Sequence, residues 1–424
     1  MPSIMSNNNA LLTLILCYLA LIMLPAIAIS STSKRSWLRF LCIPWMIFFG
    51  YKLFITAPFL SSGSIYNGMI GSQPFITFIH ATNLLLINSL DATDLVQETK
   101  LPQSAGILAR VAAAFGLLNN VRGIGTSWQV KNIPPFPVFF PPRSSPGRRR
   151  FLLRQASILV WQFLLLDLFH AAALEQDTEE ISHLYGPGRE FVYLDATAEQ
   201  QAARVALCLL SLLVGRVTID FAYRFTSLVF VGINVSLPED WPPIFGTFRD
   251  GYTLRNSWGK LWHQFLRWPF TSVTNLLTRD ILKLFHPSIL ERYINLIMVF
   301  ALSGLMHTMS YMAWGLSSQG HGPMFFFLAI ALGIIIEDGI QAAWRRLSGP
   351  STANHLCERT VGFIWVLSWM YVTAPWILYP IQRLPPERRY FFPYSIAAIV
   401  GKPIVFTAVA MGVPIMLFVF GAEF

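Results

Sequence analysis

Long, uninterrupted apolar runs constrain the fold of this 424-residue chain more than any other feature. A helix that crosses a bilayer needs about 20 consecutive, mostly apolar residues. Only 12% of the residues are charged, against roughly 25% in soluble domains. We count eight or nine such runs, at approximately 10–30, 37–60, 74–92, 151–174, 202–234, 291–316, 323–343, 360–380 and 394–420. The sequence therefore predicts an all-α, polytopic transmembrane protein that forms a single membrane-embedded domain over residues 1–424.

Three segments depart from this simple pattern. The run 202–234 is too long for one perpendicular span, so it is either one tilted helix with an extension or a broken pair. The run 105–119 is short and contains Arg110, which indicates an interfacial helix or a re-entrant piece. Residues 258–268 carry aromatic and leucine side chains at helical spacing with Lys260 and Arg267 between them, which predicts an amphipathic helix in the membrane plane.

The net charge of +9 comes from basic residues in the loops. In such loops they meet lipid head groups and set topology, so we expect the bilayer and not a nucleic acid as the partner. Their alternation predicts a lumenal N-terminus, a cytosolic loop at 93–150 and a cytosolic or interfacial, tryptophan-rich segment at 240–290. One loop, with Arg383, Arg388 and Arg389, departs from the alternation. We expect the endoplasmic reticulum membrane as the location.

The sequence motifs of several enzyme classes and metal sites are absent from this chain. The cysteines Cys17, Cys42, Cys208 and Cys357 form no CxxC pair, so neither a disulfide framework nor a structural zinc is expected. The absence of GxSxG, HExxH, P-loop and GxGxxG patterns argues against a serine hydrolase, a zinc protease and a nucleotide-binding fold. No metal site is predicted.

His307 is the sharpest candidate for chemistry, because an ionisable residue inside a span is a functional hypothesis by default. It has Ser303, Gly304 and Thr308 around it, and small residues let another group approach the helix closely. A neutral imidazole there can take a proton from a substrate hydroxyl. Judged on these residues alone, a hydrogen-bonded packing histidine is the favoured interpretation.

The tryptophan-rich segment supplies a second group of candidates. A Trp pair four residues apart precedes His263 and Gln264, which are able to polarise a carbonyl or to orient a second substrate. The alternative is a surface helix whose tryptophans anchor it to the membrane and whose polar residues are solvated. The candidate residues of this segment are Asn256, Trp258, Trp262, His263 and Gln264.

Two further sets of polar residues have a functional and a structural interpretation. Arg122 is a candidate to bind the phosphates of coenzyme A, and Trp128 is a candidate to stack on its adenine. The structural alternative is a basic loop that lies on the membrane surface. Glu337 and Asp338 are candidates for substrate binding, although pairing with Arg345 and Arg346 is favoured.

Other ionisable residues within the runs are interpreted as structural. The pairs Asp167 with His170 and Asp220 with Arg224 share helix faces and are expected to tie helices together. His80 is expected to be a packing residue.

Two of these motifs together resemble a known family. The pattern Trp258-Gly259-x-x-Trp262-His263, followed by Ser303-Gly304-x-x-His307, is similar to the wax synthase-like branch of the membrane-bound O-acyltransferases, and more specifically to fungal secondary-metabolite O-acetyltransferases. Supporting segments are Arg122–Trp128, Pro243–Phe248 and Ile336–Gln341. The family box usually begins with Phe where this chain has Ser257, and the histidine's partner is often Asn where this chain has His263.

The resemblance implies transfer of an acyl group, most simply acetyl from acetyl-CoA, to the hydroxyl of a lipophilic alcohol such as a terpenoid. It implies His307 as the catalytic base, His263 as a second catalytic residue, and Ser303 among the substrate-binding positions, around a central tunnel with interfacial helices. Acyl-CoA would be a co-substrate, with no permanently bound cofactor. A wax synthase is the enzymatic alternative. A transporter is the non-enzymatic one, although no inverted repeat is visible. The oligomeric state is left open.

Overall fold

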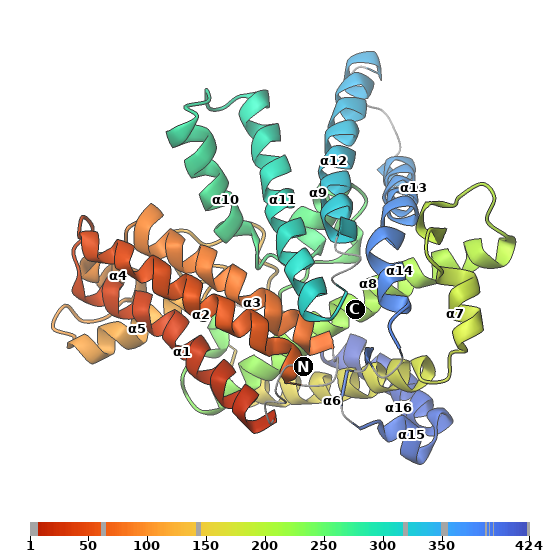
Figure 1. Cartoon of the computed structure of the whole chain (residues 1–424), viewed down its shortest axis with the longest axis horizontal. Helices are drawn as coiled ribbons and strands as arrows, with labels where there is room; N and C mark the ends of the chain where they lie inside the picture. Colours follow the sequence, from red (N-terminus) through yellow and green to blue (C-terminus); the bar gives the residue numbers. More distant parts are fainter. Residues whose placement is uncertain are drawn as a thin grey trace. The chain divides into compact units, whose positions relative to one another are not determined.

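Helices account for the regular structure of the chain (Figure 1). The computed structural model describes residues 7–60, 65–140, 146–316, 321–348, 355–385, 388–389, 391–392 and 394–421, and no strand occurs among them. Their α-helices are α1 (Asn7–Ser31), α2 (Cys42–Thr56), α3 (Ile65–Thr82), α4 (Ala92–Thr99), α5 (Ile107–Asn119), α6 (Arg148–Ala173), α7 (Thr178–Tyr185), α8 (Ala198–Gly232), α9 (Leu254–Asn256), α10 (Arg267–Asn275), α11 (Ile289–Ala313), α12 (His321–Ser348), α13 (His355–Thr373), α14 (Pro375–Gln382), α15 (Ile396–Val400) and α16 (Lys402–Pro414).

Eight of the described helices are long and apolar enough to cross a membrane. A ninth candidate is the pair Leu356–Thr373 and Pro375–Gln382, which is bent by 48°. The eight spans are Asn9–Ser31, Trp37–Phe59, Ile65–Ile87, Arg148–Ala173, Ala198–Gly232, Ile289–Ala313, His321–Leu347 and Lys402–Val419. The all-α fold with eight or nine spans that the sequence predicts is thereby confirmed.

The chain divides into two compact units. Unit 1 comprises residues 1–131 and 264–338, and unit 2 comprises residues 132–263 and 339–424. This division was not expected from the sequence.

Unit 1 is organised around α1, α2, α3 and α5, which share one apolar core. Arg39, only 1% exposed, fastens the start of α2 to the end of the third span, because it donates to the carbonyl oxygens of Leu85 (3.0 Å) and Leu90 (2.7 Å). Helix α11 crosses α3 at two glycines of α3. A Cβ atom on Gly71 would lie 2.2 Å from the Cβ of Ala313, so these two helices touch through their backbones.

Unit 2 is built on α6 and α8, which pack against each other. Within α8, Arg224 forms an ion pair with Asp220 four residues earlier (2.5 Å). Gln162 of α6 donates a hydrogen bond to the same carboxylate (2.7 Å). Helix α16 joins α6 through a hydrogen bond from Trp161 to the carbonyl of Val409 (2.9 Å). The predicted pairing of Asp220 with Arg224 is confirmed, and it ties α8 to α6.

Two boundaries differ from the sequence prediction, and one alternative that the sequence left open is resolved. The third span begins at Ile65 and not near residue 74, because Asn67 and Gly68 are buried by packing, although they are not apolar. The run at 202–234 is one continuous helix of 35 residues. The last run is interrupted at Gly401, whose φ of +100° ends α15 and separates it from α16.

Two smaller expectations also have an outcome. His80 is fully buried and its Nε2 lies 3.0 Å from the carbonyl oxygen of Leu117, which confirms its packing role. Asp167 accepts a hydrogen bond from the backbone N–H of Ala397 (2.7 Å), so it ties α6 to α15. All four cysteines are free thiols, and of these only Cys357 is exposed.

Candidate active site

His307 lies on the face of α11 that meets α12. Its imidazole stacks on the ring of Phe327, with 4.6 Å between the ring centroids and 16° between the planes. One turn earlier on the same face, a Cβ atom on Gly304 would lie 3.0 Å from the Cα of Met324. The absence of a side chain at Gly304 therefore brings α12 close enough for Phe327 to lie flat against His307.

The surroundings of His307 differ from those of His80, which lies in the third span, also in unit 1. Among the residues that the structure describes, none forms a hydrogen bond with the His307 ring, and the side chain is partly exposed. A buried packing histidine is expected to have a partner for at least one ring nitrogen, as His80 has for its Nε2. An imidazole held by stacking keeps its nitrogens available for a substrate.

The opposite side of α11 is fixed by apolar packing. Met306 is 5% exposed and clusters with Ile79 of α3 and Phe270 of α10. The start of α11 is capped by Ser288, which accepts a hydrogen bond from the backbone N–H of Glu291 (3.1 Å). Ser303 is 8% exposed, one position before the glycine that contacts α12. The helix that carries His307 is thus held by α3, α10 and α12.

The tryptophan-rich segment belongs to unit 2 up to His263, and the single helix predicted over 258–268 is wrong. Helix α9 passes into a π turn over Ser257–Leu261. The chain then becomes extended at Trp262 (ψ 156°), and α10 begins only at Arg267. The physical reason is a competing contact, because the carbonyl of Leu261 accepts a hydrogen bond from the N–H of Gly246 (2.9 Å) in place of a helical partner.

Aromatic rings organise this turn. Trp262 packs edge to face on Phe245 (5.4 Å between centroids) and lies 5.8 Å from Trp258. His263 lies 6.0 Å from the same Phe245 ring and is partly exposed. Asn256 is fixed by Thr253, which accepts a hydrogen bond from its backbone N–H (3.0 Å). These contacts bring together the rings of Trp258, Trp262 and His263, and their membership of one functional site stays a prediction.

The support beneath this aromatic group is the segment around Phe245 and Gly246. Arg216 of α8 donates to the carbonyl of Gly246 (3.2 Å) and covers the Phe245 ring at 4.7 Å. Sequence reasoning noted this segment only as part of a resemblance. The sequence does not indicate that this segment supports the aromatic group or that Arg216 holds it, because these contacts join residues far apart in the chain.

Gly246 offers a direct test of this support. A Cβ atom there would lie 2.3 Å from the backbone carbonyl oxygen of Lys260, which cannot rotate away. We expect Gly246→Ala to destabilise the protein by about 1–3 kcal/mol, a typical cost of overpacking, and to lower turnover. Thermal unfolding in detergent, followed by tryptophan fluorescence, measures the first effect.

Gly259 supplies the matched control, since a Cβ atom there has no neighbour within 4 Å. Gly259→Ala should unfold at or slightly above the wild-type temperature. Equal melting temperatures for the two variants would contradict the proposed role of Gly246.

The loop after α5 packs within unit 1, on the segment that begins at Gln264. Arg122 is only 2% exposed and its guanidinium lies over the Phe265 ring at 5.9 Å. Trp128 lies 5.8 Å from Trp268, centroid to centroid. Gln264 is also 2% exposed. Burial lowers the pKa of Arg267, whose side chain donates to the carbonyl of Lys131 (3.3 Å). Contacts of Arg122 and Trp128 with coenzyme A stay predictions.

Asp338, the second of the two acidic residues near the end of the seventh span, pairs with α11. Asp338 forms an ion pair with Arg292 of α11 (2.7 Å) and accepts a hydrogen bond from the hydroxyl of Tyr293 (3.2 Å). Pairing with Arg345 and Arg346 was favoured from the sequence. Glu337 is 6% exposed. Asp338 thus links α12 to α11, which is the helix that carries His307.

Among the described residues, no group of three or more His, Cys, Asp or Glu side chains lies close enough to hold an ion.

These features define a polytopic membrane protein with an accessible imidazole in one span and an aromatic, histidine-bearing turn between spans. The model of the membrane bound O-acyl transferase family matches residues 241–329, which contain both elements. The chain belongs to this family, because relatives with over 30% identity align with it along most of their length. It is therefore an acyltransferase that uses an acyl donor and an acceptor, and the transporter alternative loses its support.

Three similar proteins illustrate the relationship. Acetyltransferase pyr8 of Aspergillus fumigatus is 42% identical over 388 residues, which is 91% of this chain and 90% of the relative. Acetyltransferase atnC of Arthrinium sp is 38% identical over 411 residues, 94% of each chain. Acetyltransferase TRI7 of Fusarium sporotrichioides is 34% identical over 388 residues, 89% of this chain and 87% of the relative. No solved structure gives a significant match.

Proposed function

We propose that this protein transfers an acetyl group from acetyl-CoA to a hydroxyl of a lipophilic alcohol, such as a terpenoid, in the endoplasmic reticulum membrane. Its relatives are named acetyltransferases. The eight candidate spans of the described residues, or nine with the bent pair, would give a route for an acceptor that dissolves in the bilayer. The donor would enter from the cytosol, where coenzyme A esters are soluble.

One observation supports His307 as the general base: its ring is held by Phe327 but forms no hydrogen bond with any described residue. In the proposed reaction, the imidazole takes the proton of the acceptor hydroxyl. The hydroxyl oxygen forms a bond to the thioester carbonyl carbon, and the carbon–sulfur bond breaks. The imidazolium returns the proton to the leaving thiolate, so coenzyme A is released as a thiol. No covalent acyl-enzyme is required.

The remaining candidate residues receive binding roles in this proposal. His263, with Asn256 or Gln264, would hold the acceptor or stabilise the oxyanion. Trp258 and Trp262 would form an apolar wall beside it, and Ser303 would line the path to His307. Arg122 and Trp128 are proposed to bind the donor, and Glu337 and Asp338 to bind substrate. Holding both substrates in a water-poor passage supplies the rest of the rate enhancement.

Donor chain length separates an acetyltransferase from a wax synthase. We expect microsomes that contain the protein to convert labelled acetyl-CoA at least tenfold faster than labelled palmitoyl-CoA, with a mixture of polycyclic and long-chain alcohols as acceptors. Microsomes with an inactive His307→Ala variant give the background. Preferential use of palmitoyl-CoA with long-chain alcohols would replace the acetyl proposal with wax synthesis and leave the acyltransferase class intact.

A further inference from the structure

Three polar side chains form a stripe along α11. Ser303, His307 and Ser310 follow one another at spacings of four and three residues, which places them on one face of the helix. Leu305 and Met312 are 41% and 45% exposed. Each of them lies two residues from a member of the stripe, which is roughly the opposite side of a helix with about 3.6 residues per turn. The polar stripe is therefore turned away from the exposed, apolar side of α11.

The two hydroxyl groups of this stripe are not used within the helix. Several serine and threonine side chains in the spans of this protein donate to the carbonyl four residues earlier, as Ser30 (2.8 Å) and Thr308 (2.9 Å) do. Neither Ser303 nor Ser310 forms such a bond, or any other side-chain hydrogen bond with a described residue. Both hydroxyls thus keep their donor and acceptor capacity, as the imidazole between them does.

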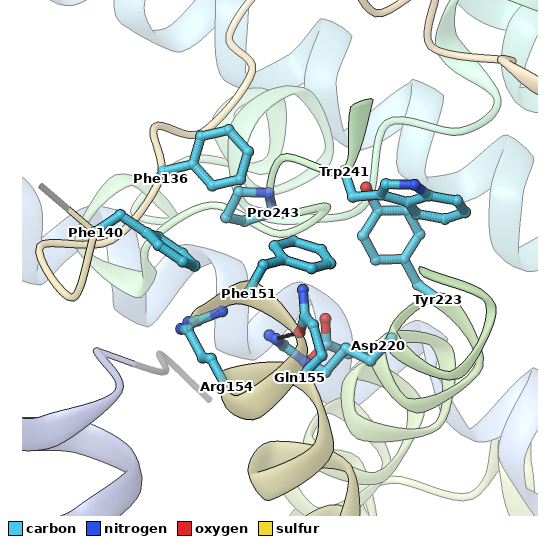
Figure 2. Close-up of a pocket in the computed structure, with 10 residues that line it drawn as sticks. Phe136, Phe140, Phe151, Arg154, Gln155, Asp220, Tyr223, Trp241 and Pro243 are labelled. Atoms are coloured by element: carbon cyan, nitrogen blue, oxygen red, sulfur yellow. Dashed lines mark hydrogen bonds and ion pairs between the residues drawn. The ribbon is translucent and has the colours of Figure 1, made fainter. Parts of the chain in front are cut away.

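Buried polar groups of unit 2 show the more common arrangement, in which they bind one another. Figure 2 shows Gln155 and Asp220 close together, and Arg224 donates a hydrogen bond to each of them (2.5 Å). A polar group without a partner is costly in an apolar environment. A row of three unused polar groups on one helix face therefore indicates that a bound molecule supplies the partners.

Ser310 is the hydroxyl best placed to contact a substrate beside His307. Its side chain is partly exposed, whereas Ser303 is 8% exposed. It lies where α3 approaches α11, because a Cβ atom on Gly68 would lie 2.7 Å from its hydroxyl oxygen. The Cβ atoms of residues three positions apart on a helix are about 5–6 Å apart. One small molecule can therefore reach the imidazole and this hydroxyl together.

We propose that Ser310 binds a second oxygen atom of the acceptor, about one turn of α11 away from the hydroxyl that His307 deprotonates. The acceptor then carries a carbonyl, ether or hydroxyl oxygen about 5–6 Å from its reacting hydroxyl. A rigid ring skeleton holds two oxygens at this separation with the least loss of conformational freedom. A plain fatty alcohol has no second oxygen. This inference rests on the proposed function, to which it adds the class of acceptor and a specificity-determining residue.

The test uses the full-length protein in detergent micelles with two rigid probes, androstan-3-ol and 3-hydroxyandrostan-6-one. The second probe adds a ketone oxygen at close to the required distance from the hydroxyl. We expect the wild type to bind the ketone about tenfold more tightly in thermophoresis, a typical effect of one hydrogen bond. Ser310→Ala should bind both probes equally. It should also fold, because alanine is the better helix former.

Ser30→Ala is the matched control, because the Ser30 hydroxyl is buried in the same unit and bound to its own helix. It should keep the wild-type preference for the ketone. Equal affinities of the wild type for the two probes, no saturable binding of either, or an unchanged preference in Ser310→Ala would overturn the proposal. So would a KM for acetyl-CoA that changes more than twofold in Ser310→Ala, since the hydroxyl would then act on the donor. Coenzyme A release on the same samples reports separately on the proposed function.

Discussion

Replacement of His307 by alanine is expected to lower turnover by about 10²–10⁴-fold, which is the usual contribution of a general base. The variant keeps the packing of α11, because the glycine contact with α12 and the cluster around Met306 do not involve the imidazole. Coenzyme A release from labelled acyl donor in the presence of acceptor measures the change. Expression, membrane insertion and melting temperature should stay close to wild type.

His183 provides the control for this experiment. It is also a histidine, it lies on the short helix α7, and its only described ion pair is with the exposed side chain of Glu199. His183→Ala should retain full turnover. A stable His307→Ala protein with near-normal turnover would show that another group removes the acceptor proton.

Replacement of Asp220 by alanine should have the largest effect on stability. The carboxylate is 8% exposed and receives hydrogen bonds from Arg224 and Gln162. Its removal leaves a buried guanidinium without a counter-charge, which typically costs about 3–5 kcal/mol. We therefore expect a markedly lower melting temperature in detergent, measured by tryptophan fluorescence.

A double variant separates the ion pair from simple packing. Asp220→Leu with Arg224→Met removes both charges and keeps apolar volume, so it should recover a large part of the lost stability. Comparison of this double variant with each single variant gives the coupling energy. Additive losses would mean that the two side chains stabilise the protein independently.

The spans were predictable because hydropathy is a local property. Helix α8 and the bent pair α13–α14 follow directly from their apolar runs. The start of the third span was misplaced because Asn67 and Gly68 are accepted in that helix only through contact with α11, where a Cβ on Gly68 would lie 2.7 Å from the hydroxyl of Ser310. A contact between residues 68 and 310, which are 242 positions apart, leaves no local pattern in the sequence.

The site was predictable only in part for the same reason. The small residues before His307 indicated a close approach, and Gly304 makes one with α12. The neighbour itself, Phe327, is one of three consecutive phenylalanines and carries no distinguishing signal. Helical spacing of the tryptophans suggested one helix, but the hydrogen bond from Gly246 interrupts it at Leu261. The spacing of the tryptophans alone does not reveal that another segment will bind a backbone carbonyl of the expected helix.

The distribution of buried and exposed thiols allows the membrane topology to be measured on the native sequence. Cys17, Cys42 and Cys208 are buried, whereas Cys357 is exposed near the start of α13. A bulky maleimide therefore has a single accessible target without any engineered cysteine. In sealed microsomes, a reagent unable to cross the bilayer would reveal which aqueous compartment that end of α13 faces, and so fix the sidedness of every neighbouring loop.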